Sequence, residues 1–81
     1  MQLTPIQVES YAGDKADETP RRFLVQDQWI EVEEVLDRWY QIKSQPEWPR
    51  ANYLKVRGTD QREHLLKHDQ ELDKWFLCRS W

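Results

Sequence analysis

The sequence predicts a small all-β domain, built as an antiparallel meander of five or six strands that curls toward an SH3-like barrel. From Arg21 to Trp81, apolar and charged residues alternate over long stretches, which is typical of a sheet with one buried face. All five tryptophans lie in this part of the chain, and aromatic and β-branched side chains favour strands. The pattern falls into two runs of hairpins, so strands that follow one another are expected to pair.

Length and composition indicate a single folded domain over residues 1–81. Of the 81 residues, 38% are hydrophobic and 33% are charged, which is more apolar material than a disordered chain carries. The sequence has no apolar run long enough for a bilayer and no signal-peptide pattern, so we expect a soluble cytoplasmic protein. The net charge of -3 does not attract polyanions, and nucleic-acid binding would need a local basic patch.

Two parts of the chain are less regular. Residues 3–11 alternate weakly, and Pro5 removes one ladder donor, so this segment is expected to be an edge strand. Residues 12–20 are expected to form a loop. A second loop is expected over residues 43–50, where Trp48 lies between two prolines and has no periodic reason to be buried.

The first hairpin is predicted in detail. A two-residue turn at residues 27–28 places Val25 opposite Ile30 and Phe23 opposite Val32. Because this register collects the apolar pairs on one face, it is the register that a half-buried sheet would select.

Residues 31–42 fit two structures. Apolar residues are spaced as on one side of a helix, at Val32, Val35, Leu36, Trp39 and Tyr40. However, the strand pattern of the hairpin continues into this stretch without a helix cap. A β-bulge at residues 33–34 would return Val35 and Trp39 to the core face of one long bent strand, and we favour this structure. The alternative is an α+β fold with residues 31–42 helical.

The last third is predicted to be a three-stranded meander. A turn at residues 59–60 places Leu54 opposite Leu65, and a loop over residues 68–74 places Leu65 opposite Leu77. One face then forms a core of Leu54, Val56, Leu65, Trp75 and Leu77. The second face mixes basic and aromatic with apolar side chains, namely Tyr53, Lys55, Arg57, Arg62, His64, Leu66, Phe76 and Cys78.

The chain carries, from Pro20 onward, the pattern Pro20-x-x-Phe23, Trp29, Val32-x-x-Val35-Leu36-x-x-Trp39, Tyr53-x-x-Val56, Leu66-x-x-Asp69 and Trp75-x-Leu77. This pattern resembles a family of short bacterial domains of unknown function, some of them encoded near error-prone DNA polymerase genes. The resemblance begins at Pro20 and does not cover residues 1–19. Because the matching positions are structural aromatics and aliphatics, the resemblance implies a fold and no specific activity, while the gene neighbourhood points toward DNA transactions.

The second face of the meander holds the main candidate binding site. Cations interleaved with aromatic rings on one sheet face are what single-stranded nucleic-acid binders present to phosphates and bases. A protein partner would instead use a tryptophan, a tyrosine and arginines, which dominate interface energetics. The alternative interpretation is a solvated face whose cations pair with the surplus acids. The candidate binding residues are Trp48, Tyr53, Lys55, Arg57, Arg62 and His64.

Other chemistry is not expected. On an extended strand, the side chains of His64 and His68 would be about 13 Å apart, too far to share one metal ion. The single cysteine, Cys78, lies in an apolar stretch without a neighbouring base, so a small buried hydrophobe is expected there. The carboxylates of residues 31–37 are interpreted as a solvated face. The sequence has no phosphate-binding glycine loop and no nucleophile motif, so no enzyme, metal or cofactor is predicted.

We therefore predict a small non-catalytic cytoplasmic module for protein interaction or an accessory role, with a protein as its partner. The first alternative is a single-stranded nucleic-acid binder that uses the basic-aromatic sheet face. The second alternative is a hydrolase acting through the carboxylates of residues 31–37.

Overall fold

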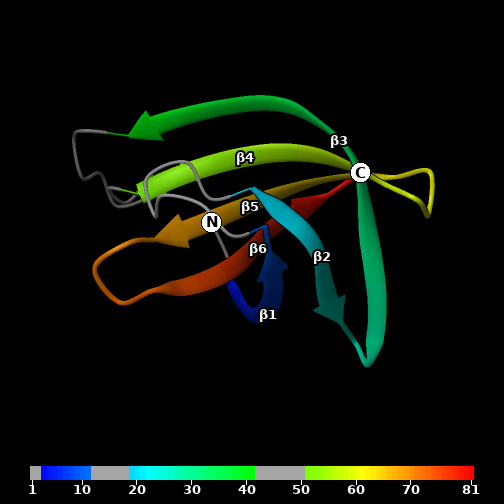
Figure 1. Ribbon diagram of the computed structural model, residues 1–81, viewed down its shortest axis with the longest axis horizontal. Helices are drawn as coiled ribbons and strands as arrows, with labels where there is room; N and C mark the ends of the chain where they lie inside the picture. Colours follow the sequence, from blue (N-terminus) through cyan, green and yellow to red (C-terminus); the bar gives the residue numbers. More distant parts are fainter. Residues whose placement is uncertain (1–2, 12–18, 42–50) are drawn as a thin grey trace.

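The computed structural model describes residues 3–11, 19–41 and 51–81, and all the regular structure in these residues is β-strand. Each strand pairs antiparallel with the next, and the first also pairs with the last, which closes a barrel (Figure 1). The all-β prediction is confirmed. The helical alternative for residues 31–42 is wrong, because residues 31–41 lie in a strand, and residue 42 is outside the described residues. The strands are β1 (Thr4–Ser10), β2 (Pro20–Val25), β3 (Gln28–Gln41), β4 (Ala51–Gly58), β5 (Glu63–Asp69) and β6 (Lys74–Ser80).

Closure of the barrel gives β1 two neighbours instead of one. Residues 4–6 pair with β6, and residues 7–10 pair with β2. The prediction of an edge strand is therefore wrong for the strand as a whole. Pro5 is nevertheless tolerated, because the half of β1 that contains it forms a ladder with β6 alone.

The β2–β3 hairpin turns at Gln26 and Asp27, one residue earlier than predicted. Both have positive φ, 50° and 63°, as the favoured two-residue hairpin turn requires. Phe23 consequently lies opposite Ile30, and the predicted pairing with Val32 is wrong by two residues. Because side chains alternate with a period of two, this shift keeps every side chain on its predicted face. Phe23 and Ile30 are indeed buried in the core.

β3 is one strand of 14 residues with two breaks in its ladder to β4. The first break lies between Val32 and Glu34, which confirms the predicted bulge and places Val35 against the core. The second break lies between Val35 and Asp37 and was not predicted. It reverses the alternation once more, so Trp39 packs on the other side of the sheet, and its predicted place on the core face is wrong.

The predicted register of β5 is wrong by one residue. Leu54 pairs with Leu66, and Val56 pairs with His64. The cause is a loop over residues 59–62, longer than the predicted two-residue turn and closed by a hydrogen bond from Gly58 N to Arg62 O. A shift of one residue exchanges the two faces, so His64 and Leu66 lie inside the barrel and Leu65 outside.

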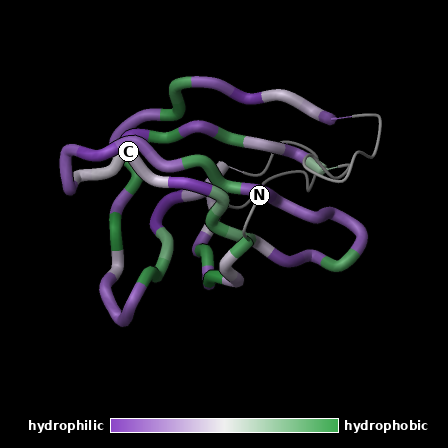
Figure 2. The backbone as a smooth tube through the Cα atoms, turned by 180° about the vertical axis from the view of Figure 1, so that it is seen from behind, coloured by the Kyte–Doolittle hydropathy of each residue, from purple (hydrophilic) through white to green (hydrophobic). Residues whose placement is uncertain are grey.

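Hydrophobic and hydrophilic residues alternate along the strands (Figure 2). Apolar side chains form two clusters, one on each side of the sheet. The barrel interior holds Phe23, Ile30, Leu54, Val56, Leu66 and Trp75. A second, smaller cluster lies on the outer side of β3 to β6 and consists of Ala51, Tyr53 and Leu65, with Trp39 and Cys78 packed against them. Trp48 lies outside the described residues.

Candidate interaction surfaces

The predicted basic-aromatic face carries a basic stripe of Lys55, Arg57 and Arg62, with Tyr53 and His64 interleaved. This stripe does not form one surface, because neighbouring carboxylates neutralise part of it. Arg57 pairs through Nη2 with Glu34, and its Nε lies 3.8 Å from Glu33 Oε1. Lys55 Nζ lies 3.1 Å from Glu63 Oε1. Arg57 therefore fits the alternative interpretation, a solvated face whose cations pair with acids. The ion pairs of Arg57 also engage Glu33 and Glu34, two of the carboxylates that a hydrolase would have used.

Tyr53 is not available to a ligand. Its side chain is fully buried in the outer cluster and its ring is stacked on Trp39, with centroids 5.5 Å apart and an interplanar angle of 16°. Burial, with a smaller contribution from the nearby Cys78, raises the pKa of Tyr53 to about 12. The tyrosine therefore helps to hold β3 against β4.

His64 lies inside the barrel and not on the outer face. Its Nδ1 is 2.7 Å from Ser80 Oγ, its Nε2 is 3.0 Å from Asp60 Oδ2, and its ring meets Phe23 edge-on at 5.1 Å. The surrounding space is full: a Cβ at Gly58 would lie 2.6 Å from Asp60 Oδ1 and 2.6 Å from Ile30 Cγ2. His64 is therefore a packed and hydrogen-bonded part of the core.

His68 is buried in a similar way, four residues along β5. Its ring stacks on Trp75 at 4.1 Å, with an interplanar angle of 7°, and its Nε2 lies 3.3 Å from Asp73 Oδ1. Within the described ranges, no group of three or more His, Cys, Asp or Glu residues is arranged to hold a metal ion.

Arg62 belongs to a group of side chains that the sequence did not reveal. Its Nε–H donates to Trp81 O at 3.0 Å, and Trp81 N–H donates to Glu63 O at 2.9 Å. Lys55 Nζ lies 4.7 Å from the centre of the Trp81 ring, and Arg79 Cζ lies 4.8 Å from it. The Trp81 side chain is 46% exposed. We call Lys55, Arg62, Arg79 and Trp81 the Trp81 cluster.

A second exposed aromatic surface lies on the outer side of β1, β2 and β3. Leu24 is directly opposite Trp29 in the ladder, and Trp29 is 37% exposed. In the next row, Arg22 lies between Glu9 and Glu31. Arg22 Nη2 donates to Glu9 at 2.7 Å, and its Cζ lies 4.3 Å from the Trp29 ring centre. These five residues are the Trp29 surface.

The charges of the Trp29 surface are fixed by their mutual contacts. The hydrogen bond from Arg22 lowers the pKa of Glu9, and the same bond raises the pKa of Arg22. Both charges therefore persist over the whole neutral range. The alternation of the hairpin could have identified this surface, because it places Leu24 and Trp29 together on the face opposite Phe23.

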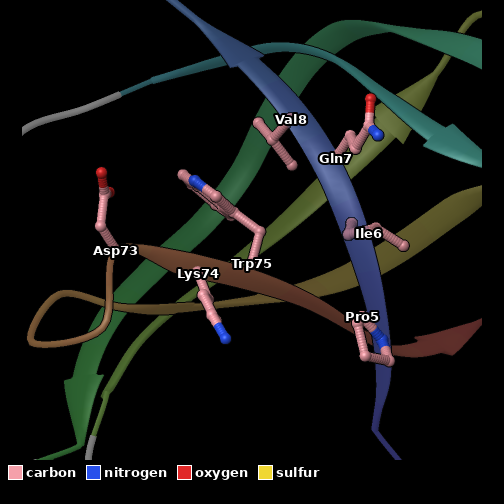
Figure 3. A pocket seen from close by; sticks show the side chains of 7 residues that line it. All are labelled: Pro5, Ile6, Gln7, Val8, Asp73, Lys74 and Trp75. Atoms are coloured by element: carbon pink, nitrogen blue, oxygen red, sulfur yellow. The ribbon is translucent and has the colours of Figure 1, made fainter.

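A groove of about 530 Å³ opens where β1 leaves β6 (Figure 3). Residues 5–8 form one side and residues 73–75 form the other. The Trp75 ring points toward Val8 across the gap, while Lys74 points away from it. Because Trp75 is itself buried against His68, the groove offers a ligand little aromatic surface.

Cys78 is a packing residue. It lies half-buried against the outer cluster, and burial raises the pKa of its thiol to about 11. A thiol that stays protonated at neutral pH is a poor nucleophile.

In the part of the chain that the structure describes, no helix is long and apolar enough to cross a membrane.

Comparisons with protein-family models, with curated proteins and with solved structures found no match to this chain.

Proposed function

We propose that this chain is a small non-catalytic module of the cytoplasm that binds a protein partner, as an interaction or accessory domain, through the Trp29 surface. The observation that carries the proposal is the exposed Trp29, which lies directly opposite Leu24 in the ladder and has Arg22 over its ring. Tryptophan and arginine are the residues that most often contribute the binding energy of protein interfaces.

The arrangement of this surface supports a protein partner. Leu24 and Trp29 supply an apolar centre, and Glu9, Arg22 and Glu31 supply a charged border. An apolar centre with a polar rim is the usual anatomy of a protein interface. Two acids and one base leave the border negative, and the net charge of -3 adds to this field, so a partner with a basic rim is favoured.

The non-catalytic part of the proposal is supported by the chemistry of the described residues. Both imidazoles are buried and engaged with carboxylates, and the single thiol has a raised pKa. An alternative function, single-stranded nucleic-acid binding, has support on a different set of strands, at the Trp81 cluster.

The experiment is an affinity capture from native lysate with matched variants. We expect wild-type protein and the Leu36→Ala variant to recover the same partner, and the Trp29→Ala variant to lose it. Leu36 is a suitable control because it is exposed to the same extent as Trp29, 37%, and lies on β3 outside the Trp29 surface. Binding should persist after nuclease treatment. Recovery of the same partner by Trp29→Ala would contradict the proposal.

A further inference from the structure

We propose that the Trp81 cluster is a weak binding site for single-stranded nucleic acid, in which the indole stacks on a base and the surrounding cations contact phosphates. Trp81 is 46% exposed, and Lys55 and Arg79 both lie over its ring within 5 Å of the ring centre. Cations held over a partly exposed aromatic ring put charge for phosphates next to a surface for a base, the combination that single-stranded nucleic-acid binders use.

The charge balance of the cluster favours an anionic ligand. Within the described residues, Arg79 forms no ion pair with a carboxylate, Lys55 pairs only with Glu63, and Arg62 donates from Nε to the main-chain oxygen of Trp81. The three cations of the cluster are thus paired with a single acidic side chain, Glu63. Arg57, on the same side of the sheet, differs in this respect because Glu33 and Glu34 both contact it.

The backbone of Trp81 is held in place before any ligand arrives. Its N–H donates to Glu63 O, and its carbonyl oxygen accepts from Arg62 Nε. An aromatic side chain on an anchored backbone loses little conformational freedom on binding, which favours affinity. The bond from Nε also places the guanidinium of Arg62 beside the main chain of Trp81.

This site differs from the basic stripe that the sequence suggested. The stripe relied on Tyr53 for stacking and on Arg57 for charge, but Tyr53 is fully buried and Arg57 is paired. Trp81 and Arg79 take these two roles. The net charge of -3 opposes a polyanion at long range, so the contact depends on low ionic strength.

The test is fluorescence anisotropy of a labelled oligothymidylate of about ten nucleotides, titrated with the protein at low salt. We expect binding that weakens with salt. The logarithm of the association constant should fall with the logarithm of the salt concentration with a slope of about 2, which corresponds to three phosphate contacts in a single strand. Trp81→Ala should weaken binding roughly ten-fold at every salt concentration, because stacking is independent of salt. Arg79→Gln should weaken binding and lower the salt slope by about 0.7.

The matched control is Arg21→Gln, which changes the net charge by the same amount at an exposed position on β2. This variant should bind like the wild type. The weaker binding of Arg79→Gln would then come from a lost local contact and not from the change in net charge. Thermal unfolding of each variant verifies that it is folded. The proposal is overturned by the absence of binding at high micromolar protein, or by equal affinities for wild type, Trp81→Ala and Arg79→Gln. A loss in Arg21→Gln as large as that in Arg79→Gln would also overturn it.

Discussion

Each buried histidine of this barrel lies beside a carboxylate. Asp60 and Ser80 reach the two nitrogens of His64, and Asp73 reaches Nε2 of His68. A buried polar group without a partner costs about 1–3 kcal/mol, so these contacts are what make the interior positions acceptable for imidazole. Two residues that would attract attention as ligand candidates are therefore explained by packing and hydrogen bonding.

Two other buried groups predict how stability depends on pH. Burial raises the pKa of Cys78 from 9.0 to about 11 and the pKa of Tyr53 from 10.0 to about 12. The unfolded chain ionises first, so the stability that comes from burying the neutral forms is complete below about pH 9 and is lost as the pH rises toward about 12.

The measurement is the free energy of unfolding in urea at a series of pH values from about 8 upward. The double variant Tyr53→Phe, Cys78→Ala should show a flatter decline than the wild type, even if its stability at neutral pH is lower. Equal slopes of the free energy of unfolding against pH for the wild type and the double variant would contradict this role of Tyr53 and Cys78.

At the level of the elements, the two hairpins show what sequence patterns can and cannot decide. In the β2–β3 hairpin, apolar residues occupy alternate positions, so a register error of two residues left the faces correct. In β5, Leu65 and Leu66 are adjacent and either could face the core. The choice is made by the loop over residues 59–62, whose hydrogen bonds are not visible in composition or periodicity.

The second break in the β3 ladder was not predictable for a related reason. A bulge leaves no residue-type signature when its neighbours are ordinary strand formers such as Val35 and Leu36. The first bulge was predictable only because the adjacent acids, Glu33 and Glu34, interrupt the alternation.

The hairpin also gives a stability prediction. Phe23 is fully buried in the barrel interior, so Phe23→Ala should lower the free energy of unfolding by roughly 3–5 kcal/mol. Leu24 lies on the outer side, and Leu24→Ala should cost clearly less. Denaturant unfolding of the two variants measures the difference. Equal losses would mean that the two faces of β2 are assigned wrongly.

For the whole molecule, closing the sheet sorts the tryptophans into different roles. Trp75 fills the interior, Trp39 supports the outer cluster, and Trp29 and Trp81 remain exposed. The alternation of the hairpin separates Trp29 from the buried Phe23, but the side of the sheet on which Trp39 packs depends on the two bulges of β3 and could not be predicted. Of the predicted binding residues that the structure describes, only Lys55 and Arg62 belong to a proposed surface.

Every assignment of an inner or outer position on β5 depends on its register, and the most direct test is NMR. Interstrand nuclear Overhauser contacts in ¹⁵N/¹³C-labelled protein report which residues lie opposite each other across β4 and β5. We expect contacts between Leu54 and Leu66 and between Val56 and His64. Contacts between Leu54 and Leu65 and between Val56 and Glu63 instead would return His64 to the outer face and contradict this register.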